Sequence, residues 1–282
     1  MRKLKSKLVL PLLAIGLIFA SCSNEETTEV VDAQNTVPQD VLDRLSAFVL
    51  NTNDVIRMEE TEGPEGIIIP AGYLVEGDLL ISDNQILELD NVRENTITTE
   101  QYRTNNLVSQ PRTISVTGWT GGGGFALSNN MRTGLQFAIN NYNRLNLNLN
   151  FVLSFNTNIN ADIVVFRQPS NSGSGGSAGF PSGGNPNRFV QIFTGLDNAN
   201  PNVNEHVTGH EIGHSIGLRH TDFFSRQSCG QNVNEGNGGV GAVLIPGTPS
   251  GFDPTSLMLA CFSFGTNGEF NANDITALNF LY

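Results

Sequence analysis

Eleven residues in the last third of the chain constrain it most: the stretch HEIGHSIGLRH, which runs from His210 to His220. His210 and His214 stand four residues apart, so on an α-helix their side chains share one face and can bind one metal ion together. Gly217 marks the end of that helix, because glycine adopts the left-handed conformation at little cost. The chain can then turn back and bring His220 to the same ion as a third ligand.

Three imidazoles leave one coordination position free, which is the arrangement of a catalytic zinc site rather than a closed structural one. Glu211 follows the first histidine, where its carboxylate can act as general base on water at the metal. The chain has four histidines in all. Because three of them fall in this register, a helix that merely happens to contain histidines is the weaker interpretation. The sequence therefore predicts one catalytic Zn2+, held by His210, His214 and His220, with Glu211 as catalytic residue.

The stretch resembles the metzincin zinc signature H-E-x-x-H-x-x-G-x-x-H, and its continuation HEIGHSIGLRHTD is similar to the HEIGH-type family of bacterial metallopeptidases. The resemblance spans roughly Arg112 to Tyr282. It implies an α+β, metzincin-like catalytic domain with a twisted, mostly parallel sheet, a long backing helix, the zinc-site helix, a Met-turn and a C-terminal helix. It also implies a zinc metalloendopeptidase that cleaves peptide or protein substrates. Met258, in the segment TSLM, fits the Met-turn that forms a hydrophobic floor beneath the metal.

The sequence lacks two features that other metzincins have, one typical of astacin-like enzymes and one of matrixins. No tyrosine follows Met258 closely, so the tyrosine metal ligand of astacin-like enzymes is not expected. No cysteine lies between residues 38 and 110, so a cysteine switch of the matrixin type is not expected either. If this N-terminal region is inhibitory, an acidic residue or simple occlusion of the site has to do it.

Three further polar positions lie near the zinc stretch. His206 is one turn before His210, about 6 Å further along the helix axis, so we expect it to pack beside the site rather than bind the same ion. Asp222 follows the third ligand by two residues and can either orient a histidine N–H or cap an exposed turn. The Asp/Asn-rich segment from Asp197 to Asn204 invites a Ca2+ site but lacks the regular spacing of a calcium loop.

The N-terminus predicts export. Four basic residues among the first seven precede an apolar run, Leu8 to Ala20, that is too short for a typical membrane span. The letters FASC, which end at Cys22, resemble a bacterial lipobox, in which the cysteine carries the lipid. Residues 1–21 are thus interpreted as a lipoprotein signal peptide, although an ordinary secretory signal with an incidental cysteine stays open. Residues 22–37, polar and acidic, are expected to tether the protein to the outer membrane, on its periplasmic or cell-surface face.

Charge and cysteines agree with an exported protein. Removal of residues 1–21 takes four of the fifteen basic residues and leaves eleven against 27 acidic ones, a net charge near −16. Without a basic stripe, nucleic acid is not an expected partner, and membrane contact is expected only through the lipid. Cys229 and Cys261 can form a disulfide in an oxidising compartment, with two free thiols as the alternative. We expect the protein to be a monomer.

The order of predicted elements divides the chain at about Pro111. Residues 38–110 begin with a short helical pattern and continue with short apolar runs around glycines, too small a region to bury much core alone. They are interpreted as a pro-region or accessory domain. Residues 111–282 hold the catalytic domain.

Within 111–282, apolar spacing predicts a long amphipathic helix over 126–145, and strict alternation predicts a strand from Leu145 to Phe155. An apolar run at 161–166, a strand at 189–193 and a last helix over 270–282 complete the pattern. The Gly/Ser-rich segment 169–187 is either a disordered surface loop or, as the metzincin resemblance implies, the rim of the substrate cleft, where Ala178 to Pro181 would receive an extended peptide.

Three classes of function fit these observations. The first is the zinc endopeptidase. The second is a non-catalytic surface lipoprotein that uses the same scaffold for binding, and the retained Glu211 argues against it. The third is zinc hydrolysis of a non-peptide substrate, since a fold does not fix its substrate.

Overall fold

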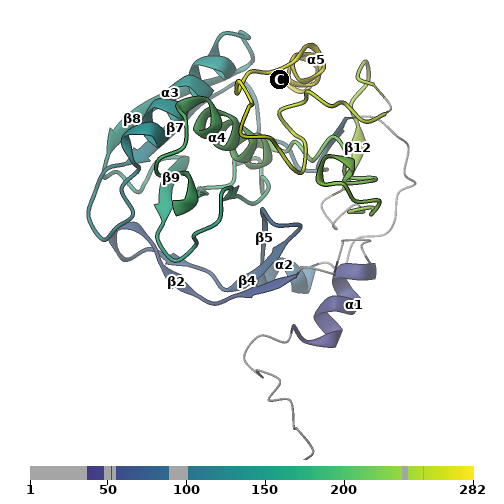
Figure 1. The fold of residues 1–282 in the computed structure, drawn as a ribbon, viewed down its shortest axis with the longest axis horizontal. Helices are drawn as coiled ribbons and strands as arrows, with labels where there is room; N and C mark the ends of the chain where they lie inside the picture. Colours follow the sequence, from purple (N-terminus) through teal and green to yellow (C-terminus); the bar gives the residue numbers. More distant parts are fainter. Residues whose placement is uncertain (1–36, 48–51, 53–54, 89–100, 237–240, 250) are drawn as a thin grey trace, which may run out of the picture. The chain divides into compact units, whose positions relative to one another are not determined.

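The computed structural model describes residues 37–47, 52, 55–88, 101–236, 241–249 and 251–282 (Figure 1). The predicted signal peptide, Cys22 and nearly all of the predicted tether lie outside the described residues. From Asn35 onward the chain forms one compact unit.

The core of residues 111–282 is a five-stranded sheet. Its strands are β7 (Arg112–Trp119), β8 (Leu149–Asn156), β9 (Ile163–Gln168), β10 (Gly176–Ser177) and β11 (Phe189–Phe193). In space they follow the order β10-β11-β9-β7-β8. All neighbours pair in parallel except β10, which runs antiparallel to β11 at one edge. The prediction of an α+β fold with a mostly parallel sheet is therefore confirmed.

Two long helices lie against each other beside this sheet (Figure 1). They are α3 (Asn129–Asn143), the predicted backing helix, and α4 (Pro201–Ile216), the predicted zinc-site helix. Apolar side chains of both helices and of four strands share one buried core. The Tyr142 hydroxyl adds a polar link, because it donates a 2.8 Å hydrogen bond to the carbonyl of Gly209. The helix that carries the histidines is thus held in place by the core.

The last helix, α5 (Ala272–Leu281), closes the chain. Asn271 caps it, and the side chains of Asn271 and Asp274 bond reciprocally to each other's backbone N–H in a capping box. At its end the Tyr282 hydroxyl donates to the carbonyl of Ile216, the final residue of α4. The predicted C-terminal helix is confirmed, and it supports the C-terminal end of the zinc-site helix.

One predicted strand begins later than its sequence pattern indicates. The alternation of leucines starts at Leu145, but β8 begins at Leu149. Asn146 has a left-handed backbone with φ of 53°, so the chain turns there before it becomes extended. Asparagine tolerates this conformation because its short polar side chain can bond locally.

The N-terminal region forms small elements of its own. They are α1 (Gln39–Ala47), β1 (Ile56–Met58), β2 (Thr61–Glu62), a 3-10 turn (Pro64–Gly66), β3 (Ile68–Ile69), β4 (Gly72–Val75), β5 (Leu79–Ser82) and α2 (Asp83–Glu88). Strands β1, β4 and β5 form one antiparallel sheet, and β2 pairs with β3. Their apolar side chains do not close a core alone, because the cluster that they build is completed by Phe180 from the Gly/Ser-rich segment.

Residues 101–108 lie before the expected boundary near Pro111 but contact the catalytic part closely. Strand β6 (Tyr102–Arg103) pairs with β12 (Val243–Leu244), and Val108 belongs to the main core. The backbone N–H of Arg219 donates to the carbonyl of Tyr102 over 2.9 Å. This segment therefore braces the loop that follows the zinc-site helix.

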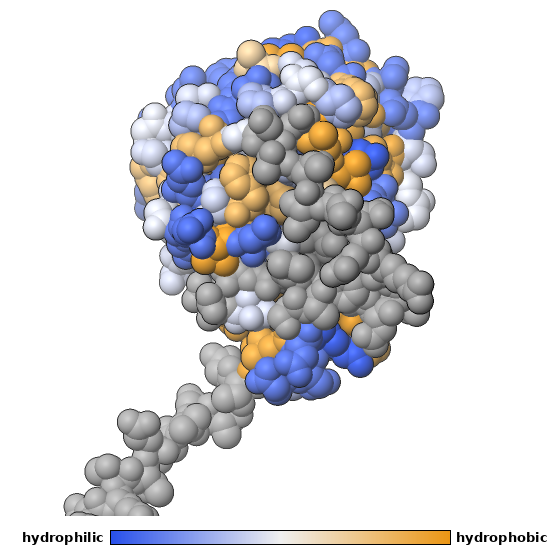
Figure 2. Space-filling view, turned by 90° about the vertical axis from the view of Figure 1, so that its right-hand side faces the viewer, coloured by the Kyte–Doolittle hydropathy of each residue, from blue (hydrophilic) through white to orange (hydrophobic). Residues whose placement is uncertain are grey.

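No helix among the described residues is both long enough and apolar enough to cross a bilayer. Figure 2 shows hydrophilic and hydrophobic residues interspersed on the face that it views.

Candidate metal centre and active site

The zinc-site helix begins and ends where local sequence rules place it. Asn200 caps its start by accepting from the backbone N–H of Asn202, and Pro201 occupies the first helical position, where no N–H is needed. Gly217 ends it with φ of 112°, and its N–H bonds back to the carbonyls of Gly213 and His214. This left-handed turn redirects the chain, so that His220 returns to the two helical histidines.

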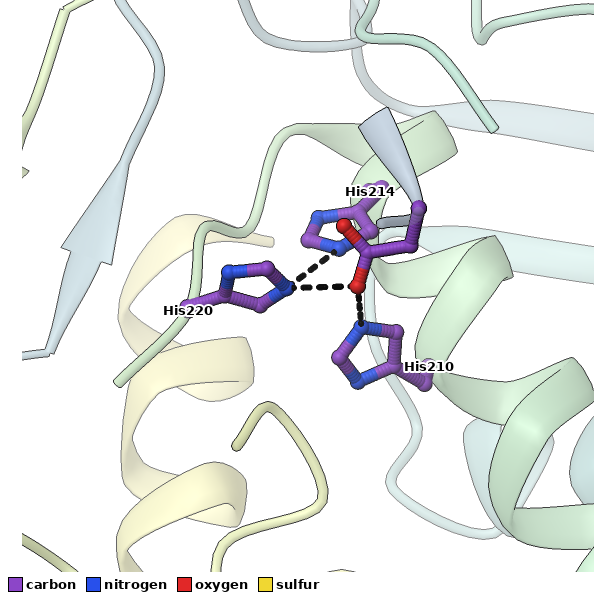
Figure 3. A group of neighbouring side chains, drawn as sticks. His210, His214 and His220 are labelled. Carbon is purple, nitrogen blue, oxygen red and sulfur yellow. Dashed lines mark hydrogen bonds and ion pairs between the residues drawn. The ribbon is translucent and has the colours of Figure 1, made fainter. Parts of the chain in front are cut away.

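The three imidazole rings point toward one another (Figure 3). Each ring has its Nδ1 bound from behind: that of His210 lies 2.9 Å from the carbonyl of Leu257, and that of His214 lies 2.9 Å from the carbonyl of Leu218. A carbonyl only accepts, so these Nδ1 atoms carry the proton. The Nδ1 of His220 lies 2.9 Å from both carboxylate oxygens of Glu235. The Nε2 atoms of all three rings therefore face the common centre, which is the arrangement of metal-binding histidines.

The distances fit a small tetrahedral ion. The Nε2 atoms of His214 and His220 are 3.2 Å apart. Ligands at about 2.0–2.1 Å from a tetrahedral Zn2+ lie about 3.3 Å from one another, so these two nitrogens already sit at that spacing. The Nε2 of His210 is buried without a hydrogen-bond partner. Imidazole nitrogens with free lone pairs are the donors that zinc prefers, so the residues present fit the predicted metal.

A carboxylate that the sequence did not assign also faces this centre. The dashed lines in Figure 3 run from His210 and His220 to one carboxylate oxygen. It is Oδ2 of Asp78, 3.0 Å from the Nε2 of His220 and 3.5 Å from the Nε2 of His210. Asp78 and the three histidines form a group whose ligand atoms could hold one metal ion. Burial alone would raise the pKa of Asp78, but His220 and His210 hold it well below its usual range.

Glu211 lies beside the histidines with its side chain 2% exposed. Its Oε2 has no hydrogen-bond partner. Burial first, and then the Asp78 carboxylate, raise the pKa of Glu211 well above its usual range. Glu211, His210, Asp78 and Gly176 all line one cavity of about 190 Å3. Strand β10 approaches so closely that a Cβ on Gly176 would lie 2.8 Å from Cγ of Glu211, so glycine is required there.

Glu235 is the other residue that the sequence did not reveal. It is fully buried and pairs with both His220 and Arg226, whose Nη1 donates to Oε1 over 2.6 Å. Burial would raise the pKa of Glu235, but His220 and Arg226 lower it, so the carboxylate stays ionised. A charged acceptor behind an imidazole fixes the ring and makes it a stronger ligand.

The segment around Met258 connects to two of the histidines. The carbonyl of Leu257 receives the Nδ1 proton of His210, and the carbonyl of Met258 accepts from the N–H of Thr221, the residue after His220. The Met258 side chain is buried, and its sulfur packs against Gly213 of the zinc-site helix. These contacts tie the segment of Met258 to His210 and to the residue after His220, and its role as a Met-turn stays a prediction.

The structure places Asp222 away from the histidine rings. Its carboxylate accepts from the backbone N–H groups of Ser228 and Ala260, which joins the loop after the third ligand to the segment after Met258. The role of holding a histidine N–H, considered for Asp222, belongs instead to Glu235. Cys229 and Cys261 form a disulfide across the same two segments.

The two remaining candidates also find other partners. His206 packs against Phe262, and its Nδ1 lies 3.1 Å from the hydroxyl of Thr266. Burial, and then His210, lower the pKa of His206 to about 3, so this ring is neutral. In the segment considered for Ca2+, both carboxylate oxygens of Asp197 accept from Arg167 over 2.7 Å.

Three comparisons with known proteins gave different kinds of match. No curated protein sequence matches the chain. Two solved structures of myroilysin are similar, each with 15% identity: one has a TM-score of 0.40 and covers 62% of this chain and 81% of that one. The other has a TM-score of 0.41 and covers 63% and 86%. The family model described as dual-action HEIGH metallo-peptidase matches residues 73–282. With that match over most of its length, and with three histidines and a glutamate converging as the signature predicts, the chain belongs to the dual-action HEIGH metallo-peptidase family.

Proposed function

We propose that this metallopeptidase is an endopeptidase that uses one Zn2+ and hydrolyses peptide bonds inside unfolded or extended protein substrates. The observation that carries the proposal is the convergence of three Nε2 atoms next to a buried, unpaired glutamate oxygen. His210, His214 and His220 would hold the ion. A zinc ion at such a site supplies Lewis acidity and lowers the pKa of water to about 7.

Glu211 would move the proton that the reaction requires. Its free Oε2 accepts a proton from the attacking water, whose oxygen bonds to the scissile carbonyl carbon. As the C–N bond breaks, the same oxygen returns the proton to the leaving nitrogen, so the products are a free carboxyl group and a free amine.

The substrate would bind as an extended strand. Strand β10 forms the edge of the sheet next to the cavity, and Ala178 continues it. Backbone groups at a sheet edge bind any extended peptide, and the side chains lining the cavity select among them. This supports a peptide substrate over a small non-peptide one.

The test is Glu211→Gln, with Glu205→Gln as the matched control. Both glutamates are buried in α4, but Glu205 bonds to Asn141 on the far side from the metal. Each variant is made in the chain from Ser23, once with the native Asp78 and once with Asp78→Asn. Zinc content and cleavage of unfolded casein are measured for every form. We expect Glu211→Gln to keep one zinc per chain and to cleave casein about 100–10,000-fold more slowly than its parent. Glu205→Gln should keep both the zinc and the cleavage rate of its parent. Equal cleavage by all variants would exclude Glu211 as the base, and zinc without cleavage in every form would favour a binding role.

We further propose that the protein is an exported lipoprotein, monomeric, and attached to the outer membrane through Cys22. The support is the signal-like N-terminus and the disulfide, which suits an oxidising compartment. Radiolabelled palmitate should enter the wild-type chain but not Cys22→Ser. Labelling of both, or of neither, would contradict the anchor.

A further inference from the structure

We propose that Asp78 is a fourth metal ligand and that the hairpin turn which carries it keeps the peptidase latent. This inference rests on the proposed function, because a closed coordination sphere matters only if the open position is used. An active zinc site needs one position for water and substrate, whereas four protein ligands make a closed, inert site. The sequence alone had left an acidic residue or simple occlusion as the ways in which this region could inhibit.

The ligand spacing supports a fourth ligand. Three of the six distances among the Nε2 atoms and Asp78 Oδ2 are 3.0, 3.2 and 3.5 Å. They scatter around the edge of about 3.3 Å expected for a tetrahedral Zn2+ site. The Asp78 side chain is only 13% exposed, and its carboxylate would be costly to bury there without a cation or charged partners. Its position is therefore that of a ligand rather than of a surface acid near the site.

The backbone of the hairpin directs Asp78 to the metal. Strands β4 and β5 pair antiparallel, with Val75 opposite Leu79, so residues 76–78 form the turn. Glu76 and Gly77 both have left-handed backbones, with φ of 61° and 93°. A glutamate rarely adopts this conformation, so its surroundings must fix it. One such contact comes from Arg226, whose Nη2 donates to the carbonyl of Glu76 over 3.2 Å.

The same turn occupies the edge where a substrate would bind. The N–H of Ala178 donates to the carbonyl of Asp78, and the N–H of Leu80 donates to the carbonyl of Ala178, each over 3.1 Å. Ala178 extends the edge strand β10, so its backbone groups are already paired with the hairpin. Gly77 and Asp78 also line the cavity that contains Glu211. An extended peptide therefore cannot bind at Ala178 while this turn stays in place.

The hairpin is anchored, so it will not leave by side-chain motion alone. Phe180, two residues beyond Ala178, packs in the same buried cluster as Leu79 and Val75. Leu80 packs on a second cluster that contains Trp119 and Phe166 of the catalytic part. Displacing the turn exposes several apolar side chains to water, each at a cost of about 1.5–3 kcal/mol. In the wild type, release then needs either a cut in the chain or a rearrangement of the whole N-terminal region, and loss of the Asp78 ligand makes that rearrangement more frequent.

The experiment uses the full chain from Ser23 loaded with Co2+ in place of Zn2+, and azide as a probe of the open position. We expect azide to leave the visible spectrum of the wild type unchanged and to shift that of Asp78→Asn and Asp78→Ala with saturation. Glu65→Gln, an exposed acid of the same region, is the matched control and should behave as wild type. The zinc forms of the two Asp78 variants should cleave casein about tenfold or more faster than wild type, since most wild-type molecules are blocked.

A saturable shift of the wild-type spectrum by azide would overturn the inference, and this result needs no variant to fold. Thermal unfolding checks that Asp78→Asn and Asp78→Ala are intact. Azide binding only in the variants, without casein cleavage by any form even after a cut on the N-terminal side of Gln101, would support the ligand and refute the endopeptidase. Cleavage at equal rates in wild type and variants, with azide bound in all of them, would support the endopeptidase and refute Asp78 as the fourth ligand.

Discussion

Replacing Glu235 by glutamine should weaken metal binding although Glu235 does not touch the metal. In the wild type, the Glu235 carboxylate accepts from the Nδ1 of His220 with both oxygens at 2.9 Å and from the Nη1 of Arg226 at 2.6 Å. A glutamine offers one oxygen and one NH2 group. Either the Nδ1–H of His220 or the Nη1–H of Arg226 therefore loses its acceptor and faces the NH2 group of the glutamine.

Two magnitudes follow from this geometry. Loss of the group that orients a metal-binding histidine typically lowers metal affinity about 10–100-fold, which is about 1.4–2.7 kcal/mol. The substitution also lowers the free energy of unfolding of the metal-free protein, because Glu235 is fully buried and Arg226 nearly so. Removing one partner of a buried ion pair costs about 3–5 kcal/mol, and the retained oxygen of glutamine reduces that to the lower end.

Both effects are measurable in one preparation. Competition with a chromophoric chelator gives the zinc affinity, and urea unfolding of the metal-free chain gives the stability. Glu269→Gln is a suitable control, because this half-exposed glutamate pairs with Arg144 away from the histidines. Zinc affinity of Glu235→Gln within twofold of wild type, at a stability lowered as expected, would refute the idea that Glu235 orients His220.

Two more predictions concern α4 and its neighbours. Burial first, and then the Glu269 carboxylate, raise the pKa of Glu205 to about 7 from 4.5. Between pH 4.5 and about 7 the folded state therefore binds one more proton than the unfolded state. The free energy of unfolding falls as the pH rises through this range. Glu205→Gln should therefore be more stable than wild type at pH 8, by up to about 3 kcal/mol, and equal to it at pH 4; a constant difference in urea midpoint across this range would contradict the assignment. Gly176→Ala should bind zinc normally but cleave about tenfold more slowly or worse, because its methyl group displaces the Glu211 carboxylate; unchanged kcat with normal zinc content would refute that steric argument.

The sequence predicted the part of the site that local geometry determines. His210 and His214 face the same way because of helical periodicity, and Gly217 ends the helix because of its backbone freedom. The cap of the last helix is local in the same way, since Asn271 bonds to groups within three residues. These features depend on neighbours within a few residues, so a pattern of letters contains them.

The groups that complete the site depend on long-range contacts. Asp78 meets His220 across 142 positions of the chain, and Glu235 reaches the same ring from a Gly/Asn-rich loop without periodicity. Asp222, close in sequence to the third ligand, looked the better partner, yet the turn at that point directs its carboxylate to two backbone amides. A usable signal did exist for Asp78: the pair Gly77-Asp78 lies between two apolar runs, which is typical of a hairpin turn.

Strand β6 has a consequence for the size of any mature enzyme. Residues 101–104 hold the loop of the third histidine through Tyr102 and Arg219 on one side and through Thr104 and Gly217 on the other. A processing cut that frees Asp78 and leaves this brace in place must therefore fall on the N-terminal side of Gln101. A chain shortened to begin at Pro111 would lose the brace along with the inhibitor. Its inactivity would then report a misplaced His220 rather than a missing activator.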